Sequence, residues 1–245
     1  MRTSGTPDGV GMVIRKPLIA LAAAAVCATM FSAPASAQPA APAAGCADLG
    51  GTVQTDQTCH IETKTATYSF DVDYPLDYPD QQSLTDFVRQ DRDDFLNFVA
   101  TLPPRDWPYE HGVHPHAYRS GTAASGTDSI VFEIYGDSGA HPVTSFDSLS
   151  YDRGTRTPIT FDELFKPGTD PVAVLDPIVQ REMDKQWRSY GGRAPRNTLG
   201  ARTYQNFALT DDAVIFYIPQ GMWLAEVAGA QRVSVPRSEL ASVLA

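Results

Sequence analysis

The residues best suited to nucleophilic chemistry stand together in the hexapeptide Gly136–His141, which reads GDSGAH. A Gly-Asp-Ser-Gly sequence frames the nucleophile of chymotrypsin-like proteases, but that chemistry also needs a histidine base and a buried aspartate held in one geometry. No partner segment of that type precedes the hexapeptide, and the Gly-x-Ser-x-Gly elbow of α/β-hydrolases is absent from the sequence. Because Asp, Ser and Gly are common turn residues, we interpret the hexapeptide as a hairpin loop. Ser138 and His141 remain the candidate catalytic residues for ester hydrolysis.

Three histidines, His111, His114 and His116, form a second group that could do chemistry. His114 and His116 would share one face of a strand and could supply two metal ligands, with a third from elsewhere. Pro115 between them disfavours a strand, and the glutamate of a zincin motif is absent. We therefore expect exposed loop histidines, with no metal and no cofactor.

Four aspartates, Asp71, Asp73, Asp77 and Asp80, surround two Tyr-Pro pairs. A calcium loop of the EF-hand type needs alternating oxygen ligands, a sharp glycine turn and a closing bidentate glutamate. Neither the glycine nor the glutamate is placed correctly here. These aspartates therefore indicate the solvated edge of a strand.

The N-terminal segment has the pattern of an export signal. The basic pair Arg15-Lys16 precedes an apolar run of 14 residues, Leu18–Phe31, and the small-residue site Ala35–Ala37 follows. A bilayer-spanning helix needs roughly 20 apolar residues, so this run is too short for an anchor. The pattern predicts a signal peptide over residues 1–37, cleaved after Ala37.

The cysteines agree with export. Cys27 would leave with the signal peptide, whereas Cys46 and Cys59 would remain as an even pair in an oxidising compartment, where a structural disulfide is expected. The Pro- and Ala-rich residues 38–45 read as a disordered linker. The chain from 46 to 245 would then form one secreted domain.

Composition and charge restrict the class of partner. The 245-residue chain is 42% hydrophobic, which excludes a disordered protein, and its net charge of −10 argues against nucleic-acid binding. Removal of residues 1–37 takes away three basic residues and one acidic residue, leaving 208 residues with a net charge of −12. We expect a monomer without a stable membrane anchor, secreted or associated with the cell envelope. Its acidity favours a basic extracellular protein or an envelope ligand as partner.

Periodicity predicts an α+β fold. Alternation of apolar and polar residues predicts strands, and apolar residues at helical spacing predict helices, the first of which ends before Pro103-Pro104. Short turns between the middle strands favour an antiparallel meander over a parallel arrangement. One mixed, mainly antiparallel sheet with two main helices accounts for the pattern. The expected strands cover 68–74, 113–120, 129–135, 143–151, 214–218 and 232–235, and the expected helices cover 83–102, 161–165, 171–190 and 236–244.

A family resemblance covers nearly the whole chain after the signal. It is carried by Tyr78–Gln81, Gly139–Pro142, Pro158–Leu164, Asp170-Pro171, Tyr204–Tyr217, Val235–Ser238 and Leu244-Ala245, together with the pair Cys46 and Cys59. In these stretches the sequence resembles the secreted immunogenic proteins of mycobacteria, the MPT series of culture-filtrate antigens. The resemblance implies a β-grasp-like sheet around a helix. It also implies that a C-terminal part, about 140–245, is of the type shared with the lysozyme-binding anti-sigma factor RsiV.

The same resemblance implies exported antigens that have no established catalytic residues, although some related sequences are labelled esterases. We therefore expect a protein that acts by binding, outside the cell or in its envelope. A first alternative is a carboxylesterase-like hydrolase that uses the loop Gly136–His141. A second is binding of lysozyme or of a peptidoglycan fragment.

Overall fold

The computed structural model of the chain describes residues 41–188, 191–196 and 200–245. All of these belong to one structural unit, residues 39–245. The predicted signal peptide over 1–37, with Cys27 and the cleavage site after Ala37, lies outside the described residues. Within the described part, no helix is both long enough and apolar enough to cross a bilayer.

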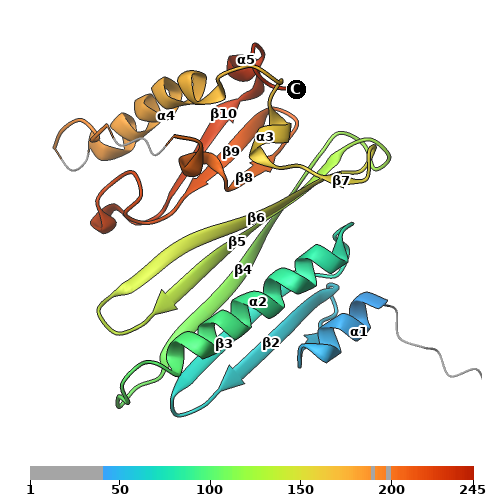
Figure 1. The fold of residues 1–245 in the computed structure, drawn as a ribbon, viewed down its shortest axis with the longest axis vertical. Coiled ribbons are helices and arrows are strands. Elements are labelled where there is room, and N and C mark those ends of the chain that lie inside the picture. Colours follow the sequence, from blue (N-terminus) through green and yellow to red (C-terminus); the bar gives the residue numbers. More distant parts are fainter. Residues whose placement is uncertain (1–40, 189–190, 197–199) are drawn as a thin grey trace, which may run out of the picture. The chain divides into compact units, whose positions relative to one another are not determined.

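A seven-stranded mixed sheet dominates the N-terminal part (Figure 1). Its strands lie side by side in sequence order, and every neighbouring pair is antiparallel except β3 and β4. Parallel neighbours need a long crossover, which helix α2 (Gln81–Val99) provides here. The strands are β1 (Thr52–Val53), β2 (Thr58–Lys64), β3 (Tyr68–Pro75), β4 (Tyr109–Ser120), β5 (Thr127–Asp137), β6 (Pro142–Asp152) and β7 (Thr157–Pro158).

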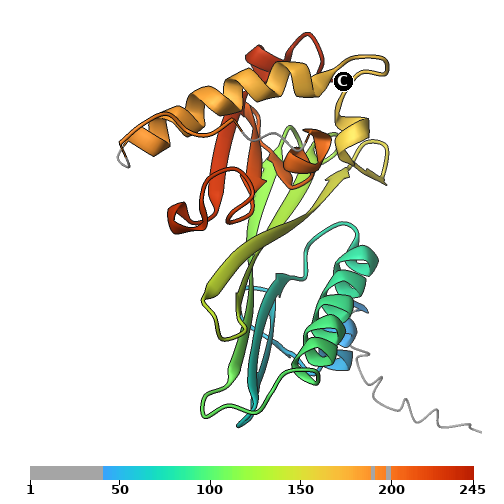
Figure 2. The ribbon, with the colours of Figure 1, turned by 60° about the vertical axis from the view of Figure 1, so that its left-hand side comes forward.

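Helix α2 covers one face of this sheet (Figures 1 and 2). It begins after Asp80, whose carboxylate accepts a hydrogen bond from the backbone N–H of Ser83, as an N-cap residue does. Its buried side chains pack with those of β2, β3, β4 and β5 into one apolar cluster. The buried residues of α2 are Leu84, Thr85, Val88, Phe95 and Val99. The helix predicted over 83–102 is confirmed.

The C-terminal strands form a second sheet. Strands β8 (Phe207–Leu209), β9 (Ala213–Ile218) and β10 (Gln231–Pro236) pair antiparallel in the order β10-β9-β8. The α+β class and the two main helices are confirmed, but these strands do not join the mixed sheet as expected. All six residues of β9 are buried, because both faces of the small sheet are covered.

One face of the small sheet packs on helices, and the other packs on the large sheet. The helices are α3 (Phe161–Leu164), α4 (Pro171–Trp187) and α5 (Arg237–Leu240). On the other face, Ala208 and Ile215 pack against Val131 of β5. The residues on either side of Val131 in β5 point to the opposite face of the large sheet and pack with α2. The two sheets therefore stack, with the small sheet on the side of the large one that α2 leaves free.

The N-terminal end of the described chain is helical. Helix α1 (Ala41–Asp48) includes residues 41–45, so the linker predicted over 38–45 is corrected for its described part. The helix is tied to β2 by the disulfide Cys46–Cys59, with the two Cα atoms 5.7 Å apart. This bond, which the sequence predicted, fixes the end of the helix against the edge of the sheet.

Pro115 lies inside β4, and the three neighbouring histidines lie on the same strand. Pairing of β4 with β3 ends at Val113, so β4 is free on that side at Pro115. A residue without an N–H is tolerated at such a free edge. The expectation that His111, His114 and His116 occupy an exposed loop is therefore wrong.

Candidate functional site

The hexapeptide around Ser138 forms a hairpin tip, as its composition predicted. Asp137 and Pro142 are the last paired residues of β5 and β6, which leaves Ser138–His141 as the connection. The carboxylate of Asp137 accepts a hydrogen bond from the backbone N–H of Gly139 at 2.8 Å. Gly139 has a φ of 113°, a conformation that a glycine adopts without strain. The tip is thus a well-formed turn.

Ser138 and His141 are both exposed on this tip, and they do not form a nucleophile–base pair. The Nε2 atom of His141 lies 3.3 Å from a carboxylate oxygen of Glu226, and its Nδ1 atom lies 3.2 Å from the carbonyl oxygen of Pro142. Ser138 makes no side-chain hydrogen bond to any residue in the described part of the chain. A nucleophile must reach its base at hydrogen-bond distance, which this arrangement does not provide.

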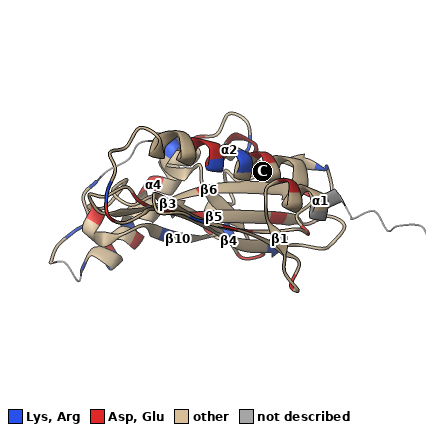
Figure 3. Cartoon of the chain, turned by 90° about the horizontal axis from the view of Figure 1, so that it is seen from below, with Lys and Arg blue, Asp and Glu red and all other residues tan. Residues whose placement is uncertain are grey.

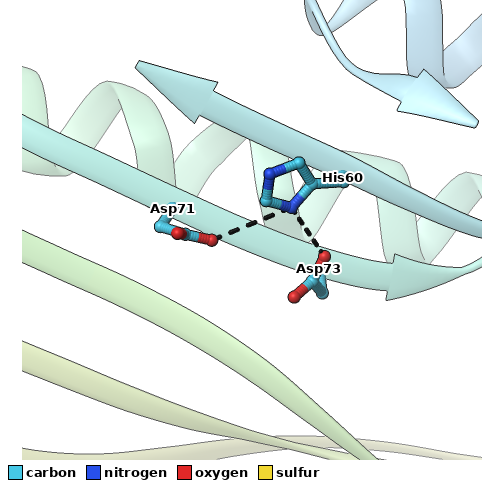
Figure 4. A group of neighbouring side chains, drawn as sticks. All are labelled: His60, Asp71 and Asp73. Atoms are coloured by element: carbon cyan, nitrogen blue, oxygen red, sulfur yellow. Dashed lines mark hydrogen bonds and ion pairs between the residues drawn. The ribbon is translucent and has the colours of Figure 1, made fainter. Parts of the chain in front are cut away.

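A different group of chemically capable side chains converges on the large sheet, on the face opposite α2 (Figure 4). His60 of β2 stands directly across from Asp73 of β3 in the antiparallel ladder. Its Nδ1 atom is 2.9 Å from Oδ1 of Asp73 and 3.9 Å from Oδ1 of Asp71. His114 of β4 approaches from the other side, with Nδ1 3.7 Å from Oδ2 of Asp73. We call His60, Asp71, Asp73 and His114 the His60 cluster.

Strand alternation explains why these four side chains share a face. Val72 between the two aspartates is buried against α2, so Asp71 and Asp73 point away from the core. The same alternation turns His60 outward between buried Cys59 and Ile61. Each orientation follows from local sequence, but the meeting of the four depends on the pairing of three strands.

Gly112 makes room for His114 in the cluster. It stands opposite Asp71 in the parallel ladder, and a Cβ atom at this position would lie 3.4 Å from Nε2 of His114. Such a contact lies at the limit of ordinary van der Waals contact. Gly112 therefore leaves space beside the imidazole ring of His114.

The cluster is partly exposed and electrostatically coupled. The hydrogen bond to Asp73 raises the pKa of His60, burial opposes this rise, and the negative charges of Asp73, Asp71 and Glu62 add to it. A surface hollow of about 580 Å³ borders the cluster on the β2 side and is also lined by Asp56 and Thr58. The site is therefore reachable by small ions and by partner side chains.

The other histidines of β4 have separate partners. His116 lies on the same strand face as His114 but bonds to Glu133 at 3.0 Å, and its ring lies 6.3 Å from that of Tyr217 in the small sheet. His111 points to the opposite face, where it bonds to Asp91 of α2 at 2.8 Å. The two-ligand metal site considered for His114 and His116 is thus not assembled by these two residues together.

The four aspartates considered as calcium ligands do not form one group, and they make different contacts. Asp77 bonds to the guanidinium of Arg119, and Asp80 caps α2. Only Asp71 and Asp73 remain together, on the solvated face of β3 as expected. Their histidine partner His60 was missed, because β2 buries only two residues, Cys59 and Ile61, and this pattern is too weak to predict a strand.

A second hollow, of about 490 Å³, borders α4 beside the buried Trp223. It carries several basic residues, which in an acidic protein could attract an anion. Three of them already face carboxylates within the described chain, so we assign no ligand here. These pairs are Arg181 with Glu239 at 3.0 Å, Lys185 with Glu182 at 2.8 Å and Arg193 with Asp184 at 3.9 Å.

Several known proteins are similar in sequence to this chain over most of its length. Esterase Rv3036c of Mycobacterium tuberculosis is 44% identical over 204 residues, covering 81% of this chain and 90% of that protein. Immunogenic protein MPB64 of Mycobacterium bovis and immunogenic protein MPT64 of Mycobacterium tuberculosis are each 40% identical over 207 residues, covering 84% of this chain and 90% of those proteins.

The C-terminal part also matches a family model. Residues 162–238 match the model described as a protein of unknown function, DUF3298. The crystal structure of a DUF3298 family protein from Pseudomonas aeruginosa PAO1 is similar with a TM-score of 0.52 at 12% identity, covering 79% of this chain and 96% of that one. At that identity the likeness concerns the fold alone.

Proposed function

The chain belongs to the family of the immunogenic proteins MPB64 and MPT64 and of esterase Rv3036c, and from this membership we propose that it is an exported, antigen-like protein that acts by binding. The N-terminal pattern over residues 1–37 supports export. The Cys46–Cys59 disulfide supports an oxidising compartment outside the cytoplasm. Association with the cell envelope is part of the proposal.

The contacts that His141 makes favour binding over hydrolysis as the function of this loop. Its two ring nitrogens face Glu226 and the carbonyl of Pro142, and neither is engaged by Ser138. The tip that carries both residues is exposed to water, whereas ester hydrolysis gains most from donors preorganised in a water-excluded site. The exposed hairpin is therefore better suited to contact a partner than to catalyse ester hydrolysis.

Kinetics on short-chain esters test this proposal. The protein, produced with its own N-terminal segment in an actinobacterial host and purified without a tag, is assayed on p-nitrophenyl acetate and butyrate. We expect the hydrolysis rate to equal that of a Ser138→Ala variant and of the buffer. Turnover well above the buffer rate would overturn the proposal, whether or not Ser138→Ala abolished it.

A carboxylesterase is the second candidate function, and two observations favour it. A relative at 44% identity is named an esterase. The His141–Glu226 pair at 3.3 Å also has the form of a base oriented by a carboxylate. Ser138 would then have to rotate to within about 3 Å of a ring nitrogen when substrate binds. This candidate requires that Ser138→Ala, His141→Ala and Glu226→Gln each lower kcat/KM.

The partner we propose is a basic extracellular protein or an envelope ligand. Acidic and basic side chains are interspersed along α2, where Arg89 pairs with Asp86 and Arg92 with Asp93 (Figure 3). Attraction would therefore come from the overall negative charge more than from one acidic patch. Capture of lysozyme by the immobilised protein at low salt, lost on addition of salt, would support this partner class. Absence of capture of any basic protein at low salt would contradict it.

A further inference from the structure

We propose that the His60 cluster binds a divalent transition-metal ion of the zinc class on the open face of the large sheet. One imidazole nitrogen, from His60, and two carboxylates, from Asp71 and Asp73, supply three donors from two neighbouring strands, and His114 of the next strand lies beside Asp73. The proposed binding function does not depend on this site, and neither Ser138 nor His141 takes part in it.

The distances between donor atoms suit such an ion. Ligands about 2.0–2.2 Å from a tetrahedral zinc lie roughly 3.3–3.6 Å from one another. The separations here, 2.9 Å and 3.9 Å from Nδ1 of His60 to Asp73 and Asp71, fall on either side of that value. The donor atoms of these three residues all lie within 4.8 Å of one another. Small side-chain rotations would bring them to coordination distance.

His114 stands beside the three donors but outside the group whose ligand atoms lie within 4.8 Å of one another. Its Nδ1 atom is 3.7 Å from the second carboxylate oxygen of Asp73, close to the separation expected for two ligands of one ion. Because Asp73 faces His60 through Oδ1 and His114 through Oδ2, it stands at the centre of the group. Its position on β3, between β2 and β4, makes this arrangement a consequence of the sheet.

The backbone that carries the donors is already ordered by the ladder. His60 and Asp73 are direct partners between β2 and β3, and Asp71 pairs with Gly112 between β3 and β4. A site on paired strands loses little conformational entropy when an ion binds, because the donors are held near their final positions. Side chains of His60 and Asp73 are 33% and 32% exposed, which leaves a path for the ion and room for a water ligand.

Donor chemistry restricts the ion. Calcium and magnesium prefer shells made of oxygen atoms, whereas imidazole suits zinc, copper, nickel and cobalt. An ion would replace the proton that His60 shares with Asp73, so metal and proton compete for the same nitrogen. Binding should therefore weaken from pH 8 to pH 6.

The alternative is that His60 and Asp73 form only a surface hydrogen-bonded pair. Exposed histidine–carboxylate pairs of that kind also occur at His116 with Glu133 on the same face of β4. That pair therefore provides a matched control. A His116→Ala variant removes an imidazole beside a carboxylate but leaves every residue of the His60 cluster in place.

Isothermal titration calorimetry of the untagged protein with zinc chloride tests the proposal, with calcium chloride as the comparison ion. We expect one zinc ion per chain, no saturable heat with calcium, and affinity for zinc unchanged in His116→Ala. His60→Ala and Asp73→Asn should each lower zinc affinity by more than the 10–100-fold that loss of an outer-shell partner costs. Cobalt absorption in the visible range gives a second readout of tetrahedral coordination by nitrogen and oxygen.

Circular dichroism and the melting temperature without metal establish that each variant is folded. Zinc should raise the melting temperature of the original protein and of His116→Ala, but not that of Asp73→Asn, which preserves the size of the side chain. Absence of zinc binding by the original protein would overturn the proposal. Zinc affinity that survives both His60→Ala and Asp73→Asn, or is lost in His116→Ala, would overturn it equally.

Discussion

The imidazole of His60 lies 2.9 Å from the carboxylate of Asp73, and the two residues face each other across the β2–β3 ladder. The two residues are 13 positions apart in the sequence, and the chain turns between them. The register of the two strands places one ionisable group directly against the other on the solvated face. Their pairing links the stability of this hairpin to pH.

Stability should depend on pH through this pair. The pKa of His60 is raised in the folded protein, chiefly by the hydrogen bond to Asp73. Its contribution is therefore fully present below the unfolded-state pKa of about 6.5 and is lost as the pH rises through the folded-state value. Because both side chains are about one-third exposed, Asp73→Asn should cost no more than about 1 kcal/mol at pH 5.5, and less at pH 8. Urea denaturation at both pH values measures the difference, and an equal cost at the two would contradict the linkage.

Asp128 should tolerate loss of one arginine partner but not of both. This carboxylate is only 4% exposed and accepts hydrogen bonds from Nε of Arg119 at 3.0 Å and from Nη2 of Arg153 at 2.8 Å. Either single alanine variant leaves one cation in place. The double variant leaves a buried unpaired charge, which costs about 3–5 kcal/mol. We expect its destabilisation to exceed the sum of the two single effects by chemical denaturation. If the losses in the two single variants simply added up in the double variant, water would be solvating the Asp128 carboxylate in place of the arginines.

Gly51→Ala should destabilise the protein by steric clash alone. A Cβ atom at Gly51 would lie 2.6 Å from Sγ of Cys59 and 2.8 Å from Sγ of Cys46. Overpacking of this kind typically costs about 1–3 kcal/mol. Gly136→Ala is the matched control, since nothing lies within 4 Å of a Cβ atom there. A melting temperature lowered only by Gly51→Ala is the expected result, and equal effects of both substitutions would count against it.

Removal of the disulfide should lower the free energy of unfolding by about 2–4 kcal/mol. The double variant Cys46→Ser/Cys59→Ser releases helix α1 from β2 and enlarges the set of unfolded conformations. Thermal denaturation with and without a reductant checks this: the reductant should lower the melting temperature of the original protein and leave that of the double variant unchanged. If the reductant lowered the melting temperature of both proteins equally, it would not be acting through this disulfide.

Much of the fold could be predicted where the pattern was long and regular. Helix α2 and the strands β3, β5 and β6 appear within a few residues of their expected limits. Helix α2 and strand β3 each have a regular apolar face, and turn residues mark both ends of the β5–β6 hairpin. Elements with a weak apolar pattern were missed, among them β2, in which only Cys59 and Ile61 are buried, and β8, which has three residues. The helix predicted to continue to 190 is α4, which ends at Trp187, and residues 189–190 lie outside the described part.

The candidate sites show the same division. The hairpin around Ser138 was predictable because turn residues act locally. The His60 cluster was not, because it needs β2 to pair with β3 and β3 to run parallel to β4 through a helical crossover. Pro115 misled the prediction for its neighbours, since a proline is compatible with a strand only where one side has no partner. That side is free because the β3–β4 ladder stops at Val113.

The sequence by itself determined the export pattern, the cysteine pair, the types of the long elements and the apolar faces of the elements that it predicted. These properties depend on neighbours within a few residues, through periodicity, capping and turn chemistry. Only the tertiary structure decided that His60, Asp71, Asp73 and His114 meet, that His141 faces Glu226, and that the last three strands form a sheet of their own. Strand order and register arise from the packing of distant segments on a shared core, and no local pattern specifies them.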